Sequence, residues 1–256
     1  MPLGTVVRDA YSDGERREIY DALEMLVRGN WWNNAGVYCF WDPETCDPLY
    51  IGVASDLPER FAQHNSLKWY RPNNGNKGKQ INEWFASHAR LGVSVVLQEG
   101  LADELYEPYS RNAEGQLLEG YRQEHGCLPP WNGVGGSRVG AGYARGNSAA
   151  WVDFATGAKD GLVVARRTIR GLNDDSGAEY NENTIHPART ALMHIGPIGD
   201  QEILGALDHL LHYMPEPLSA GENLEHRLKS YLSQPAPHPE RDTSGDRRLL
   251  PHPAEG

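Results

Sequence analysis

Gly36-Val-Tyr-Cys-Phe-Trp41 and Leu49-Tyr-Ile-Gly-Val53 are two short runs of strand-forming residues, and they decide the fold expected of this chain. β-Branched and aromatic side chains are enriched in strands because they fit a pleated, half-buried surface. The segment between the runs, Asp42-Pro-Glu-Thr-Cys-Asp-Pro48, is rich in turn residues. Together the three segments predict a β-hairpin.

Segments on both sides of this hairpin predict helices and one further strand. Residues 13–29 carry one apolar face, with Asp13 as a capping residue and Gly29 at the end. Asp56-Leu-Pro-Glu59 combines a cap, an early proline and a glutamate, so a helix is expected from there through His64. Further helices are expected over residues 79–91 and 112–125, and a strand over residues 92–97. The predicted fold class is α+β, with a small, mostly antiparallel central sheet flanked by helices.

The composition changes after residue 132. Residues 133–146 hold six glycines and two arginines, which is typical of a connector. Beyond it a second, smaller α+β region is expected, with strands over 162–169 and 191–195 and helices over about 200–213 and 221–233. The predicted organisation is an N-terminal helical extension (1–34), a core (35–133), a glycine-rich connector (134–150), a C-terminal α+β region (151–233) and a disordered tail (234–256).

Charge, cysteines and hydropathy limit the classes of protein. The net charge of −11 argues against a protein that coats nucleic acid non-specifically, although it allows a local basic site. Three cysteines, Cys39, Cys46 and Cys127, show no CxxC spacing, which favours reduced thiols over a disulfide scaffold or a zinc finger. No run of eighteen apolar residues occurs and the N-terminus lacks the features of a signal peptide. We therefore expect a cytoplasmic protein without a membrane partner.

Polar landmarks of the first half follow a specific order. They are Gly36-Val-Tyr38, Tyr50-Ile-Gly52, Arg60, His64, Leu117-Leu-Glu119 and Pro129-Pro-Trp-Asn132. Each is weak alone, but in this order, with eleven residues between Tyr38 and Tyr50, they resemble the GIY-YIG nuclease family, and its restriction-endonuclease-like members in particular. The likeness covers residues 35–133. The first tripeptide is a Val-for-Ile variant. Two departures are an interval from Glu119 to Asn132 that is about a residue longer than is common, and Trp131 as the aromatic residue before the asparagine.

This resemblance implies a three-stranded sheet with surrounding helices and divalent-metal-dependent cleavage of phosphodiester bonds. Glu119 is the implied ligand of Mg²⁺ (or Mn²⁺), since one carboxylate with waters and a substrate phosphate is an ordinary Mg²⁺ site. Arg60 offers the phosphate a planar, permanently charged fork. Either Tyr38 or Tyr50 is implied to act as a general base, which needs help because the reference pKa of tyrosine is about 10. The sequence leaves that choice open.

Four further residues are assigned to this site. His64 lies one helical turn beyond Arg60, where it could relay or orient a proton or simply lie on the helix surface. Gly36 belongs to the first tripeptide, and Gly52 would let a backbone or substrate approach closely. Asn132 is expected to hold its loop near Glu119 rather than to touch substrate.

A basic stretch follows the predicted helix that carries Arg60. No acidic residue occurs between Glu59 and Glu83, whereas lysines and arginines there are interleaved with asparagines. Such residues offer phosphate contacts beside groups that reach base edges, although an ordinary solvated loop is the alternative. The candidate nucleic-acid-binding residues are Lys68, Arg71, Asn73, Asn74, Lys77 and Lys79.

These features predict a DNA endonuclease of the restriction or defence kind, because no helicase motif, P-loop, zinc finger or helix–hairpin–helix repeat accompanies the catalytic module. The alternatives are a structure-specific repair or mobile-element nuclease and an inactive nucleic-acid-binding protein. The expected partner is double-stranded DNA, and a homodimer is compatible with this interpretation. The C-terminal region, with Arg166, Arg167 and Arg170, is expected to contribute recognition, so a chain ending near residue 140 is expected to keep weak cutting if it folds.

Overall fold

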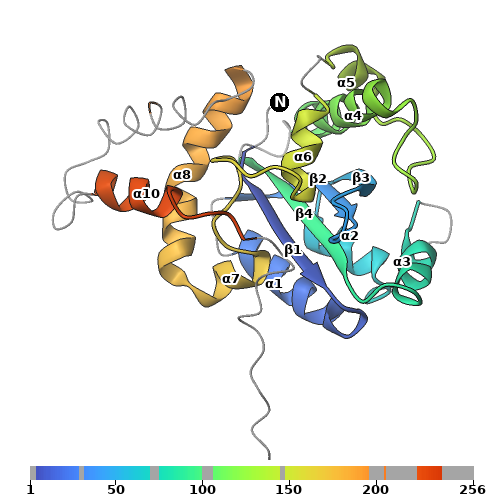
Figure 1. Ribbon diagram of the computed structural model, residues 1–256, viewed down its shortest axis with the longest axis horizontal. Helices are drawn as coiled ribbons and strands as arrows, with labels where there is room; N and C mark the ends of the chain where they lie inside the picture. Colours follow the sequence, from blue (N-terminus) through green and yellow to red (C-terminus); the bar gives the residue numbers. More distant parts are fainter. Residues whose placement is uncertain are drawn as a thin grey trace, which may run out of the picture.

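The computed structural model describes residues 4–28, 32–69, 75–99, 106–144, 148–195, 205 and 224–237. Its centre is one sheet of four strands, β1 (Val6–Tyr11), β2 (Trp32–Trp41), β3 (Pro48–Ala54) and β4 (Leu91–Glu99). The strand order is β1-β4-β2-β3, and every neighbouring pair is antiparallel (Figure 1). The predicted hairpin and the strand over residues 92–97 are confirmed, as is the α+β fold class.

Strand β1 lies in the segment that was predicted as a helical extension, so the sequence pattern missed it. All six of its residues are buried, including Arg8 and Asp9. Arg8 donates to the main-chain oxygen of Lys159 at 3.0 Å, and Asp9 accepts from Arg170 at 2.9 Å. Because β1 is covered on both faces, its sequence shows no alternation of polar and apolar residues.

Four helices around the sheet confirm those predicted in the first half. They are α1 (Arg16–Arg28), preceded by the short 3₁₀ helix η1 (Asp13–Glu15), α2 (Leu57–His64), α3 (Gly78–Phe85) and α4 (Tyr106–His125). Helix α2 begins as expected, because the Asp56 carboxylate accepts from the main-chain N–H of Glu59 at 2.8 Å. The start of α2, which carries Arg60 and His64, is therefore set by local sequence.

The glycine-rich segment is ordered where the structure describes it, which corrects its interpretation as a plain connector. Residues 138–142 form helix α5 (Arg138–Gly142), which packs against α4. A Cβ atom on Gly115 would lie 2.3 Å from the Ser137 oxygen, and one on Gly140 would lie 2.3 Å from the Asn112 oxygen. Gly115 and Gly140 therefore permit close contact between the backbones of α4 and α5.

The C-terminal part differs from the prediction in its strands. It contains α6 (Ala150–Thr156), α7 (Ile169–Asp174), α8 (Ser176–Ile195) and α10 (Leu224–Leu232). Residues 162–169 make only an isolated parallel bridge, Val164 to Val6, because the chain turns to begin α7, and residues 191–195 belong to α8. Helix α10 confirms the helix predicted over 221–233, whereas that over 200–213 and most of the tail lie outside the described residues, apart from residue 205 and residues 234–237.

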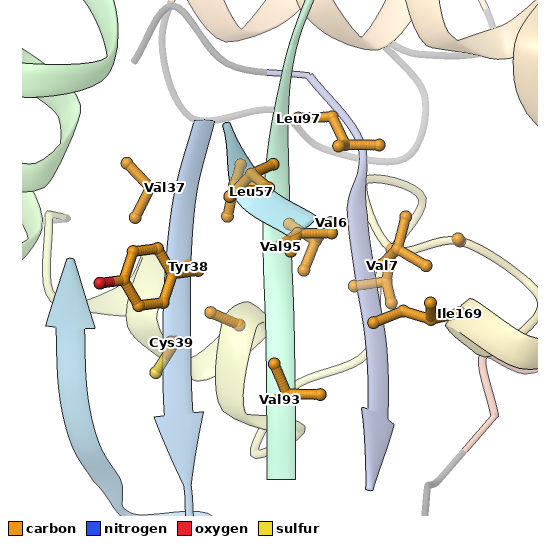
Figure 2. Close-up of a cluster of buried hydrophobic side chains, with 14 of the residues drawn as sticks. Val6, Val7, Val37, Tyr38, Cys39, Leu57, Val93, Val95, Leu97 and Ile169 are labelled. Carbon is orange, nitrogen blue, oxygen red and sulfur yellow. The ribbon is translucent and has the colours of Figure 1, made fainter. Parts of the chain in front are cut away.

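The core lies on both faces of the sheet. Figure 2 shows the buried Val93 and Val95 of β4 between side chains of β2 and β1, and Ile169 of α7 beside Val7. On the face opposite Tyr38, the Trp41 indole donates to the Ser94 hydroxyl at 2.9 Å beneath α6. In the described part of the chain, no helix has both the length and the apolar character that a membrane crossing requires.

Candidate active site

Strands β2 and β3 bring two phenols together on one face of the sheet. Tyr38 pairs with Gly52, and Phe40 pairs with Tyr50, so these four residues share that face. The ring centroids of Tyr38 and Tyr50 are 5.7 Å apart, and the Tyr38 hydroxyl points toward β3 (Figure 2). A Cβ atom on Gly52 would lie 2.6 Å from Cε1 of Tyr50 and 2.8 Å from Cζ of Tyr38. Glycine at position 52 therefore leaves the space in which the two rings meet.

Helix α2 adds Arg60 and His64 to these phenols. Arg60 Nε donates to the Tyr38 hydroxyl at 3.3 Å, and His64 Nε2 lies 2.7 Å from the same hydroxyl. The imidazole is fully buried, and its Nδ1 accepts from the main-chain N–H of Lys77 at 2.9 Å. Because a main-chain N–H can only donate, a neutral His64 must carry its proton on Nε2 and donate it to Tyr38.

The electrostatics of the site keep His64 neutral. Burial, and then the charge of Arg60, lower the pKa of His64 to about 3, which outweighs its hydrogen bond with Asn76. This imidazole is therefore a poor acceptor for the Tyr38 proton. Its contribution is to orient the phenol as a donor, so the surface position considered from the sequence is wrong.

The two phenols differ in their surroundings. Burial raises the pKa of Tyr38 well above its ordinary value, and that of Tyr50 is raised by the same cause. The interaction between the two phenols raises the pKa of Tyr38 further but lowers that of Tyr50. The contacts thus run from Lys77 N–H through His64 to the Tyr38 hydroxyl, whose ring packs against that of Tyr50.

Tyr50 lies at the wall of a cavity of about 460 Å³. Its lining residues come from β3, the segment before α3, helix α4 and the loop after Asn132; they are Tyr50, Val53, Gly75, Lys77, Arg111, Glu114, Asn132, Gly133, Val134, Gly136 and Ser137. Tyr38 is not among them. Of the two phenols, Tyr50 is therefore the one that faces the space where a substrate would fit.

The carboxylate at this cavity is Glu114, which sequence reasoning missed. Glu119 lies five residues later on α4, about 140° further around the helix. Its carboxylate accepts from Arg122 at 2.7 and 2.9 Å and from Gln123 at 2.9 Å. Glu114 lines the cavity with Tyr50 whereas Glu119 does not, so Glu114 is the better-placed candidate for a metal ligand, and the role of Glu119 stays a prediction.

The sequence contains a signal that distinguishes the surroundings of Glu119 from those of Glu114. Arg122 and Gln123 follow Glu119 at the i+3 and i+4 positions, which is typical of a polar cluster on a helix surface. Leu117 and Leu118 stand in the same relation to Glu114, and both are buried. The face of α4 that turns inward is therefore the face of Glu114.

The side chains that line the cavity include one carboxylate, Glu114, and two cations, Lys77 and Arg111. Burial raises the pKa of Glu114 to about 7, although the charge of Arg111 opposes this shift. A buried carboxylate of this kind is stabilised in its ionised form by a bound cation. Among the described residues, no three His, Cys, Asp or Glu side chains cluster as a metal cage. The donor set instead suits Mg²⁺ or Mn²⁺ held by one carboxylate, with waters and a substrate oxygen completing the shell.

Asn132 and Gly36 have structural contacts. The Asn132 amide donates to the Ile51 oxygen at 2.8 Å and accepts from the Ile51 N–H at 3.0 Å, on the outer edge of β3. It thus holds its loop at the edge of β3, next to Tyr50. A Cβ atom on Gly36 would lie 2.5 Å from the Val96 oxygen, so Gly36 permits close pairing of β2 with β4.

The basic stretch is only partly described. Lys68 forms an ion pair with Glu59 at 2.6 Å, and Lys79 one with Glu83 at 3.6 Å. Lys68 and Lys79 thus pair with Glu59 and Glu83, the two acidic residues that flank the acid-free interval. Lys77 lines the cavity, whereas Arg71, Asn73 and Asn74 lie outside the described residues. Nucleic-acid binding by this stretch stays a prediction.

The three arginines expected to recognise substrate have partners within the protein. Arg166 is buried and bonded to Asp160, Arg167 pairs with Asp175, and Arg170 binds Asp9. These ion pairs indicate a structural role, and substrate recognition by this region stays a prediction.

Comparisons with protein-family models, with curated proteins and with solved structures find no match to this chain.

Proposed function

We propose that this protein is a divalent-metal-dependent endonuclease that hydrolyses phosphodiester bonds in double-stranded DNA. The observation that supports this most is one cavity lined by both Tyr50 and Glu114, with Tyr38 packed against Tyr50 and bonded to Arg60. The order of the landmarks, which resembles that of GIY-YIG nucleases, supports the same reaction. A restriction or defence role rests on the sequence alone.

The reaction makes specific demands on these side chains. In hydrolysis, the oxygen of a water bonds to phosphorus, the bond to the leaving sugar oxygen breaks, and that oxygen takes up a proton. A bound Mg²⁺ would supply Lewis-acid stabilisation of the negative charge that develops on the phosphate oxygens. Glu114 would hold this ion, and Arg60 would contribute its permanent positive charge to the phosphate.

Tyr50 is the proposed acceptor of the water proton. It lines the cavity, and its neighbours Tyr38 and Arg60 lower its pKa against the rise caused by burial, which favours an anionic oxygen on Tyr50. Tyr38 is held as a donor by His64 and is buried behind Tyr50. Its role is therefore to position Tyr50. We therefore propose Tyr50, rather than Tyr38, as the general base.

The central test compares two glutamates of one helix. Supercoiled plasmid is incubated with Mg²⁺ and wild-type protein, with Glu114→Gln or with Glu119→Gln, and nicked and linear products are quantified. We expect Glu114→Gln to lose more than the roughly 10²-fold that loss of an outer-shell partner of a metal typically costs. Glu119→Gln should stay within about threefold of wild type, because it loses only a surface cluster.

Two results would contradict the proposal. Intact plasmid after incubation with folded wild-type protein and Mg²⁺ or Mn²⁺ would exclude the endonuclease activity on that substrate. Cutting by Glu114→Gln at the wild-type rate would exclude this carboxylate as the metal ligand. Gel mobility separates the supercoiled, nicked and linear forms of the plasmid.

A further inference from the structure

Lys77 makes three contacts that join separate parts of the candidate active site. Its main-chain N–H donates to His64 Nδ1 at 2.9 Å. Its ammonium lies 4.7 Å from the centre of the Tyr50 ring and donates to the main-chain oxygen of Trp131 at 2.7 Å. One residue thus contacts His64, the ring of Tyr50 and the loop that carries Asn132.

The position of this ammonium is fixed rather than incidental. Its hydrogen bond to the Trp131 oxygen holds it against the cavity wall, and Trp131 is itself bonded to Leu49 of the β2–β3 hairpin at 2.8 Å. A cation over the face of an aromatic ring is attracted by the ring electrons, more strongly when water is partly excluded. The attraction grows when the ring carries negative charge.

We propose that Lys77 is a positioning residue for Tyr50, whose ring it holds and whose anionic form, the form that accepts the water proton, it stabilises. This inference rests on the proposed function. It differs from the sequence-based expectation, in which Lys77 only contacts DNA phosphate. It also differs from a purely structural role, in which the ammonium merely ties the Trp131 loop to the sheet.

Three variants separate these roles. Lys77→Gln keeps a side-chain donor for the Trp131 oxygen but removes the charge, and Lys77→Arg keeps the charge. Lys159→Gln is the matched control, because Lys159 is an exposed lysine paired with Asp153 at 2.6 Å and does not line the cavity. Single-turnover cleavage of plasmid, affinity for a linear duplex without divalent metal, and the melting temperature are measured for each.

The expected result is a loss of rate without a matching loss of binding. Lys77→Gln should lower the single-turnover rate about 10-fold, the order of a partly desolvated cation–π interaction, with DNA affinity and melting temperature close to wild type. Lys77→Arg should recover most of that loss, and Lys159→Gln should cut like wild type.

Other results would overturn the inference. A Lys77→Gln rate equal to wild type would remove the role altogether. An affinity loss as large as the rate loss would make Lys77 a phosphate contact, and a lowered melting temperature that Lys77→Arg does not restore would make it structural. Intact plasmid with the wild-type protein would instead overturn the proposed function, and this inference with it.

Discussion

Glu114 and Glu119 lie on the same helix, and their surroundings give these two carboxyl groups opposite properties. Burial raises the pKa of Glu114 to about 7, whereas hydrogen bonds from Arg122 and then Gln123 lower the pKa of Glu119. The ionised form of Glu114 is therefore unfavourable in the folded protein without a cation. A bound cation would stabilise the ionised form of Glu114, which burial disfavours.

A pH dependence of metal binding follows from this shift. The folded pKa of about 7 lies above the ordinary value of 4.5, so the stability that protonated Glu114 contributes is lost as pH rises through 7. Mg²⁺ binds the ionised form and should offset that loss. We expect Mg²⁺ to raise the melting temperature more at pH 8 than at pH 6.

The matched variant for this measurement is Glu114→Gln, which lacks the titrating group. Its melting temperature should show little response to Mg²⁺ at either pH. A response equal to that of wild type would mean that Mg²⁺ binds elsewhere on the protein.

At the scale of elements, the site depends on a loop that pairs with the edge of the sheet. The Asn132 side-chain amide accepts from the Ile51 N–H and donates to the Ile51 oxygen, and the Trp131 N–H donates to the Leu49 oxygen. The side-chain amide therefore acts like one more residue of a neighbouring strand. This pairing covers the edge of β3 and ties the segment after α4 to the strand that carries Tyr50.

Loss of this pairing should lower the free energy of unfolding of the protein. Asn132→Ala leaves the two Ile51 groups without these partners, so we expect it to lower the free energy of unfolding by about 1–3 kcal/mol. Urea unfolding measures this change. Asn132→Asp keeps the acceptor for the Ile51 N–H but not the donor, and should fall between Ala and wild type. Equal unfolding midpoints for all three would contradict the role assigned to this amide.

At the scale of the whole molecule, the C-terminal part completes the interior around β1. The Asp9 carboxylate, with 2% of its side chain exposed, binds Arg170 at 2.9 Å, and Arg8 donates to main-chain oxygens of residues 154 and 159. Glu182 and Arg189 form a second ion pair, fully buried, and Arg189 also donates to Thr5. A chain ending near residue 140 would lack all of these partners, so weak cutting by such a fragment is no longer expected.

Arg170→Met tests this dependence by a single substitution. It leaves the buried Asp9 without its charged partner, and we expect a loss of about 3 kcal/mol in the free energy of unfolding. Arg17→Met is the control, because Arg17 pairs with Asp21 on the surface, and a change within about 0.5 kcal/mol is expected. Equal unfolding curves for the two variants would contradict the structural role of Arg170.

The sequence by itself determined the elements whose signals are local. Strand propensity and a turn specify the β2–β3 hairpin, and strand pairing then sets Tyr38 and Tyr50 on one face. A cap specifies α2, and helical spacing sets Arg60 one turn from His64. Short-range geometry relates the two residues within each pair, whereas the resemblance to GIY-YIG nucleases is what joined the two pairs into one predicted site.

Only the tertiary structure decided the features that depend on contacts between distant segments. The rotation of α4 about its axis brings Glu114 to the cavity and leaves Glu119 at the surface, and this rotation is set by packing of Leu117 and Leu118. Lys77 reaches Tyr50 and His64 through a loop whose path local propensity does not specify. Strand β1 was hidden because its charged residues find partners more than 140 positions away, and burial of a charge is possible only where such partners are present.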